Sequence, residues 1–292
     1  MFFAQYKFGP VLGTGRFGRV VQATDLKEAE EVAVKLVDHI DVTQVANKEI
    51  FALQTIPSHP HIVKLKHVAR DVCYCDKQHT ALVLQLAPHG ELFRHIEKYG
   101  HFGEEMARTY FKQLLMALKA AHEVNIYHRD VKLDNIVLGR NYELMLCDWG
   151  LSMHCPESTA YSTPNLGTES YLSPELFERN LYCPAKADVW AAACVLFCIY
   201  MGGPPFGVAS VKDWHYRAVR TNKKRFWESH ERRAPWATDN FKSLIESVFS
   251  NKEQDRPGVA EILAHPWMEG PTLTDAELTY VMNMRSTGEK EK

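Results

Sequence analysis

The chain contains 292 residues with a formal net charge of −2, so neither size nor charge points to an obligatory nucleic-acid partner. Its length fits two lobes around a core large enough to bury most apolar surface. Seven cysteines, an odd number at irregular spacing, indicate reduced thiols and a cytoplasmic protein, with the nucleus as the alternative location.

The longest apolar run covers residues 189–201. It is shorter than the ~20 apolar residues that a bilayer-spanning helix needs. We therefore expect no membrane span, and we interpret the run as a helix buried on all sides.

The first 85 or so residues mainly favour strands. Alternating and continuous apolar patterns predict strands over residues 6–11, 19–24, 31–37, 62–68 and 80–86. One helix is expected over residues 42–55, because Val45, Ile50 and Leu53 have helical spacing and Pro57 ends the pattern.

Helices dominate after a break at Ala87-Pro88-His89-Gly90. The apolar periodicity predicts helices over residues 104–124, 240–249, 259–264 and 275–284. The fold class is therefore α+β. It comprises a small antiparallel β-sheet lobe at about 1–86, a hinge at about 85–90, a mainly helical lobe at about 91–270, and a short helix and tail over 271–292.

A glycine-rich segment lies between the first two predicted strands. It has the pattern G-x-G-x-x-G-x-V, formed by Gly13, Gly15, Gly18 and Val20. Dinucleotide-binding folds place a similar motif between a strand and a helix, whereas here a strand follows it. The segment therefore predicts a hairpin whose backbone amides cover phosphates, with an ordinary hairpin turn as the alternative.

The most informative segment is His128-Arg129-Asp130-Val131-Lys132-Leu133-Asp134-Asn135, followed by Asp148-Trp149-Gly150. Asp130 can accept a hydroxyl proton, and Lys132 can neutralise charge on a phosphate in transfer. Asn135 and Asp148 offer the hard oxygen ligands that Mg²⁺ prefers. This spacing predicts phosphoryl transfer from a magnesium nucleotide.

These segments resemble the catalytic loop and metal-binding segment of eukaryotic serine/threonine protein kinases. The motifs extend from Gly13 to Arg256, and Lys132 matches the serine/threonine subset. Residues 59–63, 90–93 and 265–268 are most similar to the calcium/calmodulin-dependent and AMP-activated branch. The resemblance implies a single bilobal kinase domain over residues 1–292 that uses ATP and Mg²⁺. It also implies protein substrates phosphorylated on Ser or Thr.

The resemblance also implies how ATP is held. Lys35 would contact the α- and β-phosphates and pair with Glu49, although Glu49 could instead be a solvated helix residue. The base would lie among apolar residues and hydrogen-bond to the hinge backbone, and all of these could equally be plain core residues. The positions concerned are Leu12, Val20, Ala33, Leu84, Gln85, Ala87 and Val137.

Several further residues receive structural roles from the same resemblance. Thr168 would hydrogen-bond to Asp130 and Lys132, and Glu175 would form a buried bridge with Arg256. Leu53, Leu65, His128 and Trp149 would form an internal stack, with Asp188 anchoring His128. Trp149 departs from the usual phenylalanine, and we expect its larger indole to hinder inversion of this segment.

The resemblance further suggests regulation and substrate choice. Arg129 would receive a phosphate on the activation segment, added by an upstream kinase at Thr163 or less favourably at Ser158, Thr159 or Ser162. The alternative is an unmodified polar loop.

Glu91 and Asp134 flank the expected peptide groove and predict a preference for basic residues upstream of the target, unless Glu91 serves only the ribose. We expect a monomer without a calmodulin-binding tail in these 292 residues.

Two other classes of protein remain open at this point. A pseudokinase would bind nucleotide as a scaffold or allosteric module without catalysis. A small-molecule kinase would use the same groups on another acceptor. Every group that the chemistry requires is present, which favours catalysis over the scaffold.

Overall fold

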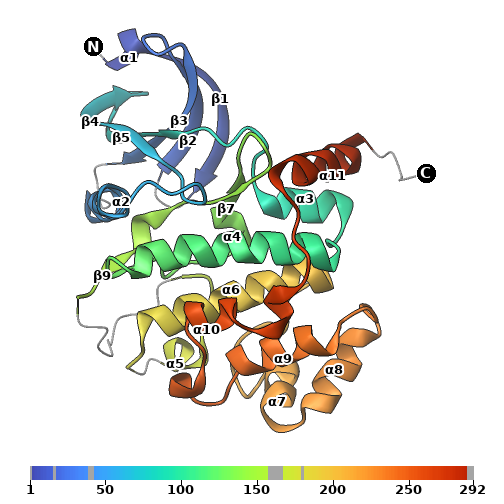
Figure 1. Cartoon of the computed structure of the whole chain (residues 1–292). Helices are drawn as coiled ribbons and strands as arrows, with labels where there is room; N and C mark the ends of the chain where they lie inside the picture. The colour runs from blue at the N-terminus through green and yellow to red at the C-terminus, as the bar shows by residue number, and fades with distance from the viewer. Residues whose placement is uncertain (1, 16–17, 39–42, 157–166, 179–180, 288–292) are drawn as a thin grey trace.

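The computed structural model describes residues 2–15, 18–38, 43–156, 167–178 and 181–287. Two lobes lie one above the other, with strands gathered in the first and helices in the second (Figure 1). The chain passes between them directly after Gln85, the last residue of the fifth strand. The expected division into a β-rich and a helical lobe is confirmed.

The first lobe is built on one antiparallel sheet in the order β1-β2-β3-β5-β4. A short helix, α1 (Phe2–Gln5), precedes it. Its strands are β1 (Tyr6–Gly15), β2 (Gly18–Asp25), β3 (Glu30–Asp38), β4 (Leu65–Tyr74) and β5 (Lys77–Gln85).

Strand β3 is buried on both faces, which explains its continuous apolar character. Val32, Val34 and Leu36 enter one apolar cluster, whereas Ala33 and Val37 enter another on the opposite face. Successive side chains of a strand alternate between faces, so Lys35 shares the face of Ala33 and Val37. Helix α2 (Thr43–Thr55) covers this face with Ala46 and Ile50 (Figure 1).

The predicted strand over residues 62–68 is wrong at its start. Strand β4 begins only at Leu65, and Ile62 instead bridges Leu146 in the second lobe. The Val63 N–H donates to the Leu146 carbonyl at 3.1 Å. The apolar residues before β4 therefore connect the two lobes rather than extend the sheet.

The second lobe is mainly helical. It contains α3 (Leu92–Tyr99), α4 (Glu104–His122), α5 (Pro174–Phe177), α6 (Pro184–Met201), α7 (Trp214–Thr221), α8 (Lys223–Glu231), α9 (Asp239–Val248), α10 (Val259–Leu263) and α11 (Asp275–Thr287). The long predicted helix over residues 104–124 and the three shorter ones are confirmed within a few residues. Helices α3, α5, α7 and α8 were not anticipated.

Helix α6 forms the centre of this lobe. It starts at Pro184, five residues before the apolar run, and the run itself is buried throughout. Among the described helices, α6 alone has the length and apolar composition of a membrane span, and 89% of that stretch is buried inside the protein. These features indicate a core helix, as expected.

Two small two-stranded sheets position the loops between the lobes. Strand β6 (Ile126–Tyr127) pairs with β9 (Met153–His154), and β7 (Ile136–Leu138) pairs with β8 (Leu144–Leu146). Residues 128–135 connect β6 to β7, and Asp148 follows β8. Ile136, at the start of β7, is opposite Leu146, at the end of β8. The end of the 128–135 segment and the start of the segment that carries Asp148 therefore lie side by side.

Candidate active site

A buried lysine connects the two lobes at the site. The Lys35 ammonium lies 2.5 Å from Glu49 Oε2 and 2.7 Å from Asp148 Oδ1. Lys35 and Glu49 are nearly inaccessible to solvent, and Asp148 is partly exposed. The structure therefore brings together β3, α2 and the segment after β8, as the Lys35–Glu49 hypothesis required.

The charges at this junction stabilise one another. Burial opposes the Lys35 ammonium, but Glu49 and Asp148 outweigh it and raise the Lys35 pKa above its ordinary value. Burial also raises the pKa of the Asp148 carboxyl, but Lys35 reverses this effect and the net pKa is lowered. The Glu49 pKa is raised, because its burial exceeds the effect of Lys35. Lys35 and Asp148 are thus both held in their charged forms.

A second cluster surrounds Asp130. Its carboxylate lies 2.8 Å from the Lys132 ammonium and accepts from the Asn135 amide nitrogen at 3.0 Å. Lys132 donates to the Thr168 hydroxyl at 2.9 Å, and that hydroxyl donates to Asp130 at 3.4 Å. The hydrogen bonds expected of Thr168 are present in the structure.

The two clusters meet across the β7–β8 hairpin. The Cys147 N–H donates to the Asn135 carbonyl at 2.9 Å, so Asn135 and Asp148 occupy neighbouring positions. The Asn135 amide nitrogen is occupied by the carbonyl and carboxylate of Asp130, and its amide oxygen is therefore the group left to accept. This oxygen and the Asp148 carboxylate form a donor set that fits Mg²⁺.

Cys147 lies beside this site without the properties of a reactive thiol. Burial raises the pKa of its thiol, with Asp148 adding to the effect. Its Sγ donates to the Asn135 carbonyl at 3.3 Å. This environment makes Cys147 an inert small side chain.

Asp188 holds the catalytic-loop segment through backbone groups. Its carboxylate accepts from the His128 N–H at 2.9 Å and from the Arg129 N–H at 2.8 Å. His122 Nε2 lies 2.9 Å from the same carboxylate. Burial raises the Asp188 pKa, but the His122 contact and the amides outweigh it and lower the net value. Sequence reasoning found Asp188 and missed His122, to which no local pattern pointed.

The expected internal stack is formed in part by direct ring contact. The His128 and Trp149 rings meet edge to face at 4.6 Å, and Trp149 is fully buried. Its indole N–H donates to the Leu146 carbonyl at 3.4 Å. Leu53 packs against the cores of both lobes, whereas Leu65 packs only against the core between the sheet and α2.

His128 fixes the backbone around the site with both ring nitrogens. Its Nδ1 accepts from the Asp130 N–H at 3.2 Å, so Nε2 carries the hydrogen donated to the Cys147 carbonyl at 2.9 Å. His128 thus links the two segments that carry Asp130 and Asp148, and it has the packing role predicted for it.

The residues expected around the base mostly share one apolar cluster. Val20, Ala33, Leu84, Ala87 and Val137 belong to it. Leu12 lies outside that cluster with 47% of its surface exposed. The residues of this cluster come from both lobes and form one apolar region between them.

Few backbone groups of the hinge are available to hydrogen-bond to a base. The Gln85 N–H donates to the Lys64 carbonyl at 2.9 Å, so only the Gln85 carbonyl is left to contact a ligand. None of the described backbone hydrogen bonds uses the Ala87 N–H, although the Ala87 carbonyl accepts from Gly90. Ala87 is therefore the hinge donor that fits a base.

The glycine-rich hairpin connects β1 to β2, with Gly15 opposite Gly18. Gly18 has φ +142°, and a Cβ there would collide with the Leu36 carbonyl. At Gly13 and Gly15 a Cβ would meet nothing within 4 Å. The sheet itself therefore requires a glycine at Gly18, whereas the backbone at Gly13 and Gly15 faces open space. Residues 16–17 lie outside the described residues.

The bridge between Glu175 and Arg256 is buried and bidentate, with distances of 2.7 and 3.2 Å. The Arg256 guanidinium also lies 4.8 Å from the centre of the Trp190 ring. Burial opposes the Glu175 carboxylate, but Arg256 outweighs it and lowers the Glu175 pKa. The expected anchor of the segment to the helical lobe is present.

Two acids expected at the peptide groove lie near the hinge and the catalytic loop. Glu91 bridges Val137 through its backbone, and its carboxylate lies 3.5 Å from Arg94. Asp134 is exposed in the 3₁₀ turn Leu133–Asn135.

The phosphorylation candidates Ser158, Thr159, Ser162 and Thr163 lie outside the described residues.

Comparison with known proteins gives one family and many relatives. The profile described as the protein kinase domain matches residues 6–268. CBL-interacting protein kinase 10 of Oryza sativa subsp. japonica is 30% identical over 270 residues, which is 90% of this chain and 56% of the relative. Putative CBL-interacting protein kinase 27 of the same organism is 33% identical over 271 residues, or 90% of this chain and 63% of the relative.

Aurora kinase B of Xenopus tropicalis is 29% identical over 269 residues, which is 90% of this chain and 70% of the relative. The chain therefore spans between half and two thirds of the two rice proteins. The matched region includes both charge clusters of the site.

Proposed function

Because the chain belongs to the protein kinase domain family, we propose that it transfers the γ-phosphate of ATP to Ser or Thr hydroxyls of protein substrates. The observation that carries the proposal is the convergence of five side chains from both lobes. Lys35 contacts Asp148, Lys132 and Asn135 contact Asp130, and Asn135 pairs with the backbone beside Asp148. Phosphoryl transfer requires such positioned charges more than strong proton abstraction.

Each of these side chains has a proposed role. Lys35, held by Glu49, binds the α- and β-phosphates, and Asn135 with Asp148 would hold Mg²⁺. Bound Mg²⁺ neutralises charge on the phosphates. Asp130 orients the acceptor hydroxyl and accepts its proton, while Lys132 stabilises charge on the transferring group. Thr168 positions Asp130 and Lys132 through its hydroxyl.

The apolar region between the lobes is the proposed base site. Val20 and Ala33 would cover the base from one side and Val137 from the other, with Leu84 behind it. The exposed Leu12 side chain would be covered by the bound base, which gives this exposed apolar residue a function. The Gln85 carbonyl and the Ala87 N–H supply the proposed hydrogen bonds to the base.

The activation segment and the substrate preference are finer proposals. Glu91 and Asp134 are partly or fully exposed acids on either side of the expected groove, and they would favour basic residues upstream of the target. Phosphorylation of Thr163 by an upstream kinase would supply an anion for Arg129. A peptide array indifferent to upstream arginine rejects the first proposal, and full activity of Thr163→Ala rejects the second.

The proposal is tested by incubating the chain with Mg²⁺, γ-labelled ATP and a basic serine peptide. Labelled peptide is the expected result. Nucleotide binding without transfer would support the alternative of a pseudokinase scaffold, and transfer to small alcohols alone would indicate a small-molecule kinase.

The unbonded state of all seven cysteines supports the cytoplasmic or nuclear location, which fractionation of cells checks directly.

A further inference from the structure

The region around α7 and α8 differs in charge from the rest of the chain. Residues 212–233 contain only three acids, against eight basic residues: Lys212, Arg217, Arg220, Lys223, Lys224, Arg225, Arg232 and Arg233. The whole chain has a formal net charge of −2. These helices therefore form a local excess of positive charge on a weakly acidic protein.

The acids of this region are already used within the fold. Asp213 accepts from the Tyr216 N–H at 3.0 Å and from the Gly207 N–H at 2.9 Å, and Glu231 pairs with Lys242 at 2.6 Å. Among the ion pairs between described residues, Lys223 and Lys224 are the only basic members of the region that take part. Arg217 and Arg220 donate to the Val211 carbonyl and to Asn251. Lys212, Arg225, Arg232 and Arg233 are therefore the cations of this region most open to an acidic partner.

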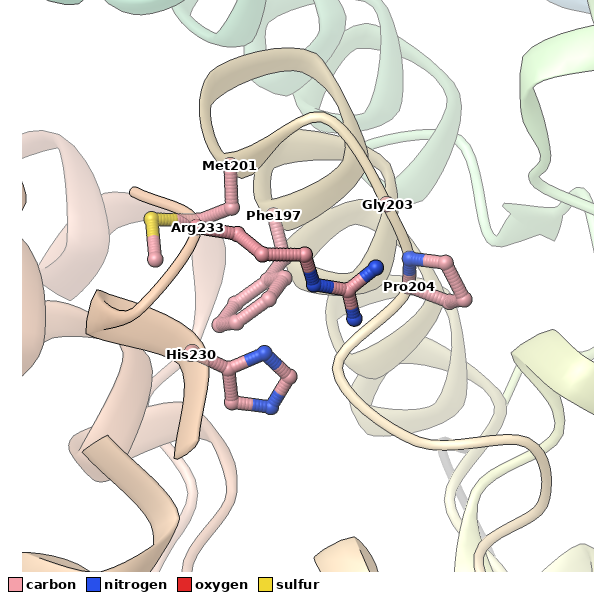
Figure 2. Close-up of a pocket in the computed structure, with 6 residues that line it drawn as sticks. All are labelled: Phe197, Met201, Gly203, Pro204, His230 and Arg233. Carbon is pink, nitrogen blue, oxygen red and sulfur yellow. The ribbon is translucent and has the colours of Figure 1, made fainter. Parts of the chain in front are cut away.

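A shallow hollow lies beside these cations, between the end of α6 and the end of α8 (Figure 2). It is lined by Phe197, Met201, Gly203, Pro204, His230 and Arg233. Figure 2 shows the Arg233 side chain crossing the hollow with its guanidinium toward Pro204. The other lining groups are mainly apolar, so the hollow offers an apolar floor with one cation at its edge.

His230 belongs to the floor of the hollow rather than to its charge. Burial lowers the His230 pKa to about 4, and its Nε2 lies 3.0 Å from the Pro205 carbonyl. The imidazole is therefore neutral at ordinary pH and donates through Nε2 to that carbonyl. Arg233 remains the cation at the hollow.

Two exposed tryptophans contact residues next to those that line the hollow. Trp214, with 45% of its surface exposed, contacts His215, whose ring lies 5.1 Å from that of His230. Trp236, with 38% exposed, donates through its indole N–H to the carbonyl of Tyr200, the residue before Met201. Exposed tryptophan beside arginine is the composition typical of the centre of a protein–protein interface.

We propose that this surface, named here the α7–α8 surface and defined by Trp214, Trp236, Arg233 and the hollow, binds an acidic protein segment. An apolar side chain of that segment packs over the shallow hollow and against the tryptophans. Its Asp and Glu residues meet Arg233, Arg232 and the neighbouring cations. The surface is built from α6, α7 and α8 and uses none of the five side chains of the proposed catalytic site.

The charge excess decides between possible occupants. A neutral apolar partner would cover the hollow but leave the surrounding cations without contacts, and it would gain no attraction from them. An acidic segment with an apolar residue satisfies both features. The association is expected to weaken with salt, because the cations are exposed and screened beyond about 8 Å at physiological ionic strength.

The test uses the full 292-residue chain carrying Asp148→Asn and a display library of random twelve-residue peptides. Selected peptides are expected to combine Asp or Glu with a large apolar residue. A synthetic peptide of the selected sequence, followed by fluorescence anisotropy, should lose affinity about tenfold or more with Trp214→Ala and with Arg233→Glu. Replacing its Asp and Glu by Asn and Gln should weaken it by a similar factor.

Lys112→Glu on α4 is the matched control, since Lys112 is also an exposed cation on a helix. It should leave peptide affinity unchanged, and Arg233→Glu in the otherwise unaltered chain should leave phosphoryl transfer to a short peptide unchanged. Circular dichroism checks that each variant is folded.

Absence of acidic peptides from the selection, or equal affinity of the selected acidic peptide for the Arg233→Glu chain, would overturn the proposal. So would tighter binding of phosphatidylserine vesicles or a twenty-nucleotide RNA through the same residues.

Discussion

The Lys35 ammonium lies 2.7 Å from the Asp148 carboxylate, although 113 residues separate the two in the chain. One comes from the central strand of the first lobe and the other from the segment after β8 in the second. Gly150 permits this approach, because a Cβ there would run into Val45 of α2. The Lys35–Asp148 ion pair thus connects the two lobes at the site.

Glu49→Gln should weaken ATP binding and destabilise the first lobe. The change leaves the buried Lys35 ammonium with Asp148 alone, and breaking a buried ion pair costs roughly 3–5 kcal/mol. Urea unfolding and the KM for ATP are the measurements. Glu30→Gln is the control, since its bridge to Lys66 is exposed and worth about 1 kcal/mol or less. Equal effects of the two variants would contradict this account.

Gly18→Ala should destabilise the sheet more than Gly13→Ala. At Gly18 the new Cβ would collide with the Leu36 carbonyl at a positive φ, whereas at Gly13 it would meet open space. We expect a loss of roughly 1–3 kcal/mol for Gly18→Ala and less than about 1 kcal/mol for Gly13→Ala. Thermal unfolding of the two variants measures the difference, and a Gly13 variant less stable than the Gly18 variant would be inconsistent with the hairpin geometry.

The ionisation of Asp188 should make the stability of the protein depend on pH. The lowered pKa of its folded carboxyl means that the charged form is stabilised in the native state. That contribution is fully present above the unfolded pKa, about 3.9, and is lost as the pH falls toward the lower folded value. Asp188→Asn should therefore be less stable at pH 7 by about 1–3 kcal/mol.

The same variant should also show a shallower loss of stability below pH 4 than the unaltered protein. Urea unfolding at pH 7, 5 and 3.5 gives both slopes. Glu175 also has a lowered pKa and contributes to the acid dependence of both proteins, so the difference between the slopes isolates Asp188. Parallel curves would show that the carboxylate has no such role.

Thr168→Ala should lower kcat with little change in the KM for ATP. The hydroxyl accepts from Lys132 and donates to Asp130, so its loss loosens both groups without touching Lys35. A decrease of roughly 10-fold to 100-fold is expected for such a misplacement. Thr168→Ser keeps the hydroxyl and should retain most activity. Similar kcat values for the Ala and Ser variants would remove Thr168 from the mechanism.

The contacts among Asp130, Lys132 and Asn135 could be predicted from the sequence because these residues occur in one short segment. The spacing from Asp130 to Asn135 is local, and the strand alternation around Lys35 indicates which face it occupies. Local patterns therefore sufficed wherever one loop or one strand fixed the geometry.

Long-range contacts explain what the sequence missed. His122 contacts Asp188 only because α4 and α6 pack together, and no local pattern specifies that contact. Ile62 has strand-like neighbours, yet it bridges Leu146 in the other lobe. The Gln85 N–H is occupied by Lys64, which could not be known before β4 and β5 were paired. Tertiary context overrode local propensity at each of these positions.

The most direct test of the central claim is the rate of γ-phosphate transfer to a basic serine peptide by Asp148→Asn compared with the unaltered chain. Asparagine keeps the size of the side chain and removes the charge that contacts Lys35 and would hold Mg²⁺. With the fold intact by circular dichroism, the account predicts a loss of at least about 10²–10³-fold. Transfer within about threefold of the unaltered rate would show that the five converging side chains do not act on a common triphosphate.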